Sequence, residues 1–418
     1  MKLSFLSALL WTATAVASQT ALATSSPLQL SLPEATRIAL RDSPTYQLAV
    51  TEVERVKGAR QAVTPPFPDN PIVSFAVGPR DQGEGAQTSY AAEILQRVDL
   101  FGQRGKRIEA ADEQVSLAEA RLRALAAELR ARARTSYITA LISDRRVAFA
   151  EQQVSFAERV FAAAEQRSAY GAASDIEKRT AETELGLSRA ASAQAQASRL
   201  VALHELRVVL GLPHDRPLTL TTPLAAPPVR PLDQRELEAA AREQRRDLQV
   251  LRQEGKAIDA EIDKLRRERL PAVWLEINVE QDSIPRGEYW VGPGVAVSAP
   301  VWQRNQGALA MAAAERQRQR IALESTEVAA LRDVNLAVAL VGQRRQEVVA
   351  LEQAIRTAEQ LRELVLEGWQ AGKFDIFRLT LADVELVTAR VGYLTALAAL
   401  WTGEIDVDRA IGVIEEGL

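Results

Sequence analysis

The chain contains no cysteine, and only two histidines and two methionines occur among its 418 residues. Without cysteine it cannot form disulfides, thiolate metal sites or a lipid anchor on a cysteine. Two histidines argue against a soft-metal site and against a histidine-based triad. Its net charge of −4, from 51 basic and 55 acidic residues, argues against a nucleic-acid partner, which requires a basic face. We therefore expect no catalytic residues, no cofactor and no metal ligands.

Proline is absent from two long tracts, 80–212 and 301–418, and glycine is absent from 106–170. Because proline is the strongest interrupter of helices, both tracts predict unusually long helices. The glycine-free tract alone would extend on the order of 100 Å as one helix. An average helix has about three turns, so helices of this length need a special architecture.

Two apolar seams run along the first tract. Residues from Ile108 to Leu129 are spaced alternately three and four apart, which is the pattern of a coiled coil. A second seam of small residues runs from Ala120 to Ala131. A soluble two-stranded rod needs only one seam, so two seams predict neighbouring helices on both sides, as in the wall of a helical barrel.

The N-terminus has the pattern of an export signal. Lys2 is followed by an apolar stretch, 3–17, and by small residues at Ala17 and Ala23. The stretch is too short to span a bilayer comfortably, so residues 1–23 are predicted to be a cleaved signal peptide. The alternative is an N-terminal membrane anchor.

The sequence repeats itself at an offset near 201. Segments 30–49 and 232–251 are parallel, as are 99–107 and 300–308, and the glycine of 170–185 aligns with the glycine of 371–386. A shared bias toward alanine, glutamate and arginine would not align prolines and glycines. The sequence therefore predicts two repeats, and their expected bounds are 24–212 and 232–418, joined by a proline-rich connector at 213–231.

Each repeat contains a predicted pair of short strands, at 70–98 and at 271–300. Within the second pair, aliphatic residues alternate with Trp274 and with polar residues, which predicts one apolar face; the aliphatic residues are Val273, Leu275, Ile277 and Val279. Such strands resemble those of outer-membrane barrels, which need eight or more strands and leave no open edge in lipid. One chain supplies four strands, so a membrane location requires several chains, and three chains would supply about twelve.

These features together resemble the TolC family of outer-membrane efflux ducts. The resemblance rests on the duplication, the strand pairs, the glycine-marked turns near 171 and 372, and the segment VLGLP at 209–213 before the connector. The segment VWQRNQG at 301–307 resembles a signature of the heavy-metal (cobalt–zinc–cadmium, CzcC-like) branch.

The resemblance implies a mainly α fold with a small β part. In this architecture a homotrimer forms a 12-stranded barrel in outer-membrane lipid, and long antiparallel coiled-coil helices form an α-barrel in the periplasm. A periplasmic adaptor protein and an inner-membrane RND-type pump would dock at the turns of the long hairpins.

By the same resemblance, a set of residues at the two turns would contact the adaptor: Tyr170, Gly171, Ala172, Ser174, Gly372 and Lys373. The alternative is that these residues only form the turns.

Charged residues beside the turns are candidates for a gate: Asp175, Glu177, Asp375 and Arg378. Arg378 stands where relatives carry an aspartate ring, which argues against a cation-selective aspartate gate. A link between Glu177 and Arg378 of adjacent hairpins would hold the closed state. Alternatively, each charge is a solvated helix residue or a cap.

The leading functional hypothesis is a passive outer-membrane duct of a tripartite efflux system that exports divalent heavy-metal cations. The same duct serving organic compounds or type I protein secretion is the second hypothesis. A periplasmic coiled-coil adaptor is the third, although it would need a larger β domain than two strand pairs. An enzyme is the least supported, since no nucleophile–base spacing or phosphate loop is apparent.

Overall fold

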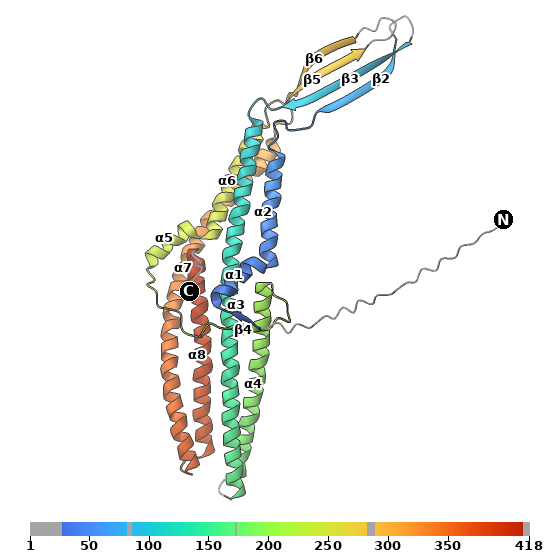
Figure 1. The fold of residues 1–418 in the computed structure, drawn as a ribbon. Coiled ribbons are helices and arrows are strands. Elements are labelled where there is room, and N and C mark those ends of the chain that lie inside the picture. The colour runs from blue at the N-terminus through green and yellow to red at the C-terminus, as the bar shows by residue number, and fades with distance from the viewer. Residues whose placement is uncertain (1–26, 82–85, 172–173, 282–288, 413–418) are drawn as a thin grey trace, which may run out of the picture.

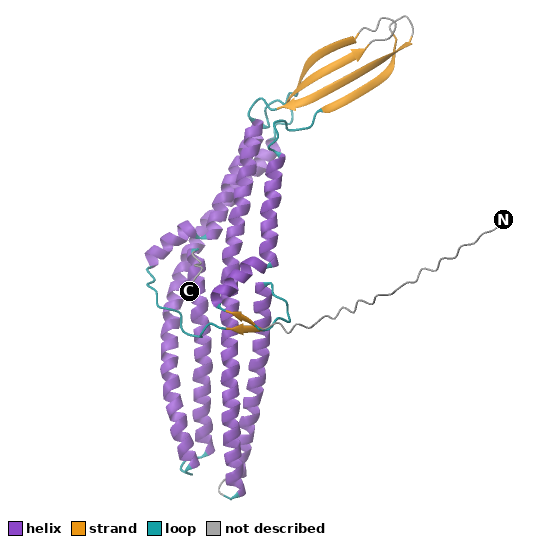
Figure 2. Ribbon diagram, in the orientation of Figure 1, coloured by secondary structure: helices purple, strands orange, loops and turns teal. Residues whose placement is uncertain are grey.

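The computed structural model describes residues 27–81, 86–171, 174–281 and 289–412. The molecule is elongated, with a four-stranded sheet at one end and a long helical body below it (Figure 1). Helices make up almost all of the body, and a small two-stranded sheet crosses it near the middle (Figure 2). We call this middle level the waist, and the end that lies farthest from the large sheet the tip.

The two halves of the chain contain the same series of elements. The first half comprises β1 (Leu28–Leu30), α1 (Leu32–Asp42), α2 (Pro44–Ala62), β2 (Ile72–Asp81), β3 (Ala86–Val98), α3 (Gln103–Ala169) and α4 (Asp175–Leu210). The second half comprises β4 (Leu218–Leu220), α5 (Gln234–Gln244), α6 (Arg246–Arg267), β5 (Val273–Gln281), β6 (Tyr289–Val297), α7 (Gln306–Gln370) and α8 (Ile376–Ile411).

The two proline-free tracts form the longest helices. Helix α3 has 67 residues and α7 has 65, so each is about 100 Å long. Both run from the sheet to the tip, where α4 and α8 turn back along them as far as the waist (Figure 1). Above the waist, α2 packs on α3, and α6 packs on both α3 and α7. Four helices therefore lie side by side both above and below the waist.

Glycine allows helix ends to meet at the waist. Helix α4 ends at Gly211, which has a φ of +68°, and α8 ends at Gly412, which has a φ of +76°. A Cβ on Gly211 would lie 2.5 Å from the carbonyl oxygen of Asp42, and one on Gly412 would collide with the backbone of Gln244 and Arg245. Each long hairpin thus ends against the junction between two short helices, and the same geometry occurs in both halves.

The start of the long helices differs slightly between the halves. Helix α3 follows Gly102 and α7 follows Asn305, both in the left-handed conformation. The backbone N–H of the residue before each, Phe101 or Arg304, donates a hydrogen bond to the side-chain oxygen of the glutamine two residues later. Asn305 lies two residues later than a constant offset of 201 would place it. The alignment of 99–107 with 300–308 is therefore displaced here, because α7 is two residues shorter than α3 while the turns at Gly171 and Gly372 keep the offset of 201.

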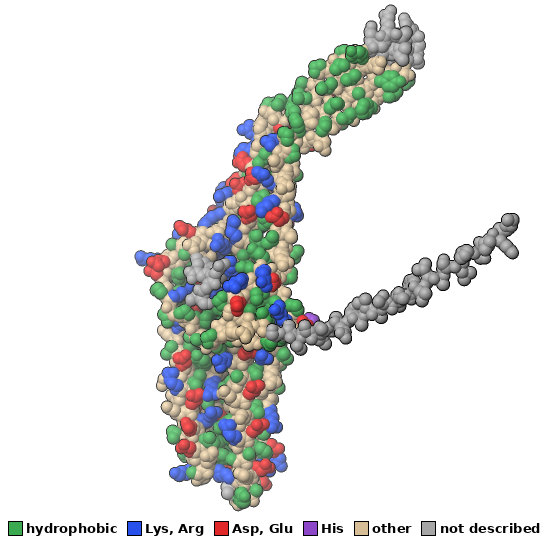
Figure 3. Space-filling model, viewed as in Figure 1, with side chains coloured by type: hydrophobic (Ala, Val, Ile, Leu, Met, Phe, Trp, Pro, Cys, Tyr) green, Lys and Arg blue, Asp and Glu red, His purple; other side chains and the backbone are tan. Residues whose placement is uncertain are grey.

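The large sheet is antiparallel throughout, with the strand order β2-β3-β5-β6. Along β5, the apolar residues Leu275, Ile277 and Val279 are exposed, whereas Glu276 and Asn278 on the other face are partly buried. Hydrophobic side chains dominate the visible surface of the sheet, while charged side chains are spread over the helices (Figure 3). The outer strands β2 and β6 each have one edge without a partner strand in the described part of the chain.

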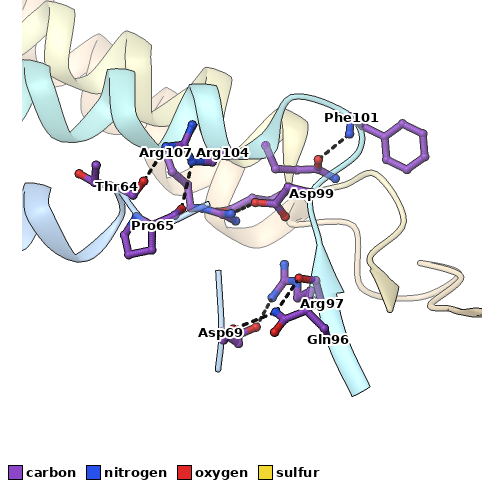
Figure 4. A network of polar contacts seen from close by, with 11 residues as sticks. Thr64, Pro65, Asp69, Gln96, Arg97, Asp99, Phe101, Arg104 and Arg107 are labelled. Carbon is purple, nitrogen blue, oxygen red and sulfur yellow. Dashed lines mark hydrogen bonds and ion pairs between the residues drawn. The ribbon is translucent and has the colours of Figure 1, made fainter. Parts of the chain in front are cut away.

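A polar network joins the sheet to the helical body (Figure 4). Arg104, in the first turn of α3, donates a hydrogen bond of 3.0 Å from Nε to the carbonyl oxygen of Pro65. Arg107, one turn later, forms an ion pair with Asp99, whose side chain is only 4% exposed. The loops on either side of β2 and β3 are thus fastened to α3, and this fixes the direction in which the sheet leaves the helices.

The small sheet at the waist is a feature that the sequence analysis did not predict. Strands β1 and β4 pair in parallel, with Leu28 opposite Leu218. The Tyr137 hydroxyl, buried on α3, donates to the carbonyl oxygen of Leu30 at 2.8 Å and accepts from the backbone N–H of Thr222 at 3.2 Å. The connector between the halves is therefore held to both the N-terminal strand and α3.

The apolar core of the helical body is concentrated at two levels. The larger cluster surrounds Tyr137 at the waist, and a smaller one surrounds Trp369 just above the tip. By length and composition alone, α8 is the one helix among the described residues that is apolar enough to cross a membrane. Its buried residues, such as Leu386 and Leu397, pack within the helical body, which accounts for part of this apolar character.

Candidate functional site at the tip

The tip consists of two turns of similar construction. Gly171 (φ +69°) follows α3, and Gly372 (φ +70°) follows α7. A polar cap then begins each returning helix. The Ser174 hydroxyl accepts from the N–H of Glu177 at 3.3 Å, and the Asp375 carboxylate accepts from the N–H of Arg378 at 2.9 Å.

The structure brings the described adaptor-contact candidates together at this end of the molecule. Tyr170 is 86% exposed, and Gly171, Ser174, Gly372 and Lys373 are also exposed. Ala172 lies outside the described residues. The backbone N–H of Lys373 donates to the carbonyl oxygen of Gly368 at 2.8 Å, so the turn is closed by the backbone and does not require the Lys373 side chain.

The gate candidates have different local roles. Asp375 is the N-cap of α8, and Asp175 and Glu177 lie in the first turn of α4. The Arg378 guanidinium lies 5.2 Å from the centre of the Phe374 ring. Within the part of a single chain that the structure describes, Glu177 and Arg378 form no ion pair with each other. A link between them would therefore have to join neighbouring chains.

The two hairpins are fastened together just above the turns. Trp369 of α7 is 1% exposed, and its backbone oxygen accepts a 2.8 Å hydrogen bond from Arg167 of α3. The Arg167 guanidinium also lies 5.1 Å from the centre of the Trp369 ring. Ile376 and Leu379 of α8 complete the same apolar cluster. The turns are thus positioned by side chains that the sequence analysis did not single out.

Two carboxylates lie where the α3–α4 hairpin packs against the α7–α8 hairpin, and the sequence analysis missed both. We call this contact between the hairpins the seam. Asp383 of α8 forms a 3.2 Å ion pair with Arg362 of α7 and accepts a hydrogen bond from Gln153 of α3. Glu184 of α4 lines the same small cavity as Asp383. The sequence did contain one sign of the site: Asp383 is a carboxylate within the apolar helix α8, where a charged residue is expected to have a specific partner.

A second ionic cluster lies at the waist. Asp408 of α8 accepts from Arg134 of α3 at 2.8 Å and from Arg230 of the connector at 2.6 Å. Glu404, one turn earlier, pairs with Arg230 at 2.9 Å and with Arg345 of α7. The spacing of Glu404 and Asp408, four residues apart on the most apolar helix, was the only sign of this cluster in the sequence.

The chemistry of the described residues provides no holding site for a metal. His204 and His214 are both exposed, and no group of three or more His, Cys, Asp or Glu side chains is arranged to bind an ion within the described ranges. What the architecture provides instead is an apolar-faced sheet joined to a long array of helices.

Comparison with known proteins now assigns this architecture. The profile of a family described as "Outer membrane efflux protein" matches residues 77–212 and 237–413. The chain belongs to the outer membrane efflux protein family. This match confirms the resemblance drawn from the duplication and the glycine turns, and it places the protein in the outer membrane as an efflux channel. Members of this family are ducts, in agreement with the expectation that the chain is not an enzyme.

Individual relatives of this family agree with the assignment. The chain is 26% identical over 393 residues to the cobalt-zinc-cadmium resistance protein CzcC of Cupriavidus metallidurans, covering 92% of this chain and 90% of that protein. Its fold is similar to that of VceC from Vibrio cholerae (TM-score 0.76, 16% identity, 91% and 96% of the two chains). It is also similar to the CmeC channel of Campylobacter jejuni (TM-score 0.78, 13% identity, 91% and 85%). The mainly helical fold with a small β part is therefore confirmed.

Proposed function

We propose that three copies of this chain assemble into a passive duct that exports divalent heavy-metal cations across the outer membrane. The observation that carries the proposal is the large sheet, which has an apolar outer face and two open edges. Lipid cannot satisfy unpaired backbone groups, so β2 must pair with β6 of a neighbouring chain. Three chains of four strands then close a barrel of about twelve strands.

The helical body supports the same assembly. Several large apolar side chains are exposed in a single chain along α4, α7 and α8: Leu187, Leu200, Val349, Leu364 and Leu381. Exposed apolar side chains that recur over the length of long helices indicate contacts with further helices. Neighbouring chains in a closed α-barrel would cover them, and the helices would extend the conduit through the periplasm.

The metal substrate is inferred from the relative CzcC, whose name refers to cobalt, zinc and cadmium resistance. Tight binding of the cation to the wall of a duct would slow its release outside the cell. A wall without metal ligands is therefore compatible with the passage of cations. Export of organic compounds, or type I protein secretion, remains the alternative for the same duct.

The tip is the proposed docking surface for a periplasmic adaptor, which would connect the duct to an inner-membrane RND-type pump. The exposed residues Tyr170, Gly171, Ser174, Gly372 and Lys373 supply this surface, and Ala172, which lies outside the described residues, is included in the proposal. We further propose that Glu177 of one chain pairs with Arg378 of the next and holds the tip closed, with Asp175 and Asp375 nearby.

Metal susceptibility of a deletion strain tests the cargo. Loss of the gene should sensitise cells to zinc, cobalt and cadmium but not to dyes, antibiotics or bile salts, and the wild-type gene should restore resistance. A Gly171→Leu variant, strained by about 1–2 kcal/mol at its positive φ, should insert into the membrane but restore resistance poorly. Gly186→Leu, on the exposed face of α4 with no atom near its Cβ position, is the matched control. Sensitivity to organic compounds alone would reject the metal cargo.

Single-channel conductance tests the latch. Reversing either charge, by Glu177→Arg or Arg378→Glu, should raise the conductance of the purified trimer, and combining both changes should lower it again, because the pair is re-formed with opposite polarity. Conductance that stays at the wild-type value in both single variants would discard the pairing.

A further inference from the structure

The two hairpins of one chain enclose a small cavity in which two carboxylates lie together. The cavity has a volume of about 20 Å³, which is roughly the space of one water molecule. Apolar side chains of α3, α4 and α8 form most of its lining, and the ionisable residues in the lining are Glu184 and Asp383. At 1.5 Å per helical residue, Glu184 lies about 14 Å from the start of α4 and Asp383 lies about 10 Å from the start of α8. The seam thus lies between the tip and the rest of the helical body.

Asp383 connects three helices and both hairpins. Its side chain is 14% exposed, and one oxygen lies 3.2 Å from Nη1 of Arg362 on α7. The other oxygen accepts a hydrogen bond from Gln153 on α3. Arg362 itself lies 4.4 Å from the centre of the Phe156 ring, also on α3. A change in the charge of Asp383 therefore alters the contacts that join the two hairpins.

Glu184 faces this group from the fourth helix, α4. It is half-buried, and it makes no hydrogen bond or ion pair with any residue that the structure describes. The charged groups around the two carboxylates are Arg362 of α7 and Arg390 of α8, and Arg390 is itself paired with Glu359. From α3, the cavity is lined by Phe156, Ala157 and Val160, which carry no ionisable group. The seam holds two negative charges against one directly bonded arginine.

Burial raises the pKa of both carboxylates. Burial raises the pKa of Glu184, and the nearby charge of Asp383 raises it further. Burial also raises the pKa of Asp383, although Arg362 and Gln153 oppose that effect. A carboxylate whose pKa is higher in the packed seam than in the separated one binds more protons when packed. The packing therefore gains stability as the pH falls through that raised value and loses it as the pH rises.

We propose that Glu184 and Asp383 are positioning residues that set how tightly the two hairpins of each chain pack above the tip. When Glu184 is neutral the seam closes, and when both carboxylates are charged their repulsion loosens it. The tip of the duct would accordingly tighten in an acidic periplasm. This inference goes beyond the proposed function, since it concerns contacts within one chain and depends on neither the cargo nor the adaptor.

The absence of cysteine allows a direct measurement on the intact protein. Spin labels at Ala169→Cys and Ala371→Cys, which are exposed residues beside the two turns, report the distance between the hairpins. Mixing labelled chains with an excess of unlabelled chains restricts the signal to pairs within one chain. In lipid nanodiscs, the distance distribution should shift to shorter values and narrow as the pH is lowered from about 8 to about 5, through the range above the ordinary value of a glutamate.

Three variants separate the proposed cause from a general effect of acid. Glu184→Gln removes one charge and should keep the short distance over the whole pH range. Glu182→Gln, on the exposed face of the same helix, is the matched control and should respond as the wild type does. Asp383→Asn keeps an oxygen for Arg362 or Gln153 but removes the second charge, so the transition should move to lower pH.

Two results would overturn the proposal: a wild-type distance that does not change with pH, and a pH response in Glu184→Gln equal to that of Glu182→Gln. Recovery of trimers by each variant checks that the fold is intact. Because both labels lie on one chain, this test and the metal susceptibility test can fail independently of each other.

Discussion

The ionic clusters at the waist and in the seam both connect α3 to α8, yet their charges are balanced differently. At the waist, Glu404 and Asp408 are surrounded by Arg134, Arg230 and Arg345. In the seam, Arg362 pairs with Asp383, and Glu184 has no ion-pair partner among the described residues. Buried ions are tolerated when they are paired, so the charge balance at the waist favours a permanent contact between α3 and α8. The seam retains an excess of negative charge that protons can remove.

The connector explains why the waist needs its extra arginines. Arg345 donates to the carbonyl oxygen of Pro228 at 2.9 Å, and Nε1 of Trp401 donates to the carbonyl oxygen of Ala225 at 2.9 Å. The same cluster that joins α3 to α8 thus also holds the strap between the two halves. Below the waist no such strap crosses the hairpins in the described residues, and the seam depends on side chains alone.

Removing the central carboxylate of the waist should have the largest effect. Asp408→Ala would leave Arg134, whose side chain is 7% exposed, without its charged partner. Breaking a buried pair in this way costs about 3–5 kcal/mol. Denaturant unfolding of the protein in detergent, followed by circular dichroism, measures this loss. Asp406→Ala removes a side chain that is 44% exposed from the same helix, and it should cost at most about 1 kcal/mol. Equal losses in the two variants would contradict a special role for the waist.

Truncation in the seam should have an intermediate effect. Asp383→Ala removes the acceptor of both Arg362 and Gln153, which are only partly exposed, at a cost of about 1–3 kcal/mol. Asp383→Asn retains one acceptor and should cost less. Amide hydrogen exchange in the helical segments between Asp383 and the tip should become faster, whereas exchange at the waist should not change. A loss that spreads equally to both levels would show that the two clusters are not separate.

The exposed caps of the tip should have the smallest effect. Ser174→Ala and Asp375→Ala each remove one N-cap hydrogen bond, which is worth about 1 kcal/mol. Asp375→Asn preserves the cap and removes the charge. If Asp375 acts only as a cap, the Asn variant should match the wild type in both thermal stability and single-channel conductance. A change in conductance alone would instead assign it to the gate.

Much of the fold was predictable because it is local. The absence of proline and glycine predicted the long helices, and Gly171 and Gly372 marked their turns. Alternation along 273–279 predicted a strand with one apolar face, and open edges required partners. Such features depend on residues that are close in sequence, where spacing and backbone preference decide the outcome.

The contacts that position the tip were not predictable in the same way. Gln153 and Asp383 are separated by 230 residues, and Arg134 and Asp408 by 274. In the sequence each of them looks like one more polar residue on a long helix. The pairing of β1 with β4 was missed for a similar reason, since three-residue strands carry too short a pattern to be recognised.

Repeats, periodicity and the positions of proline and glycine are properties of the chain itself, and they were enough to predict the helices, the turns, the strand pairs and the family. Which charged residues become buried partners depends instead on the packing of distant helices. Burial removes water from a carboxylate, and its energy then depends on the few groups that folding brings within reach. For this reason the packing at the waist is expected to be independent of pH and the packing in the seam to depend on it, although both clusters are made from the same kinds of residue.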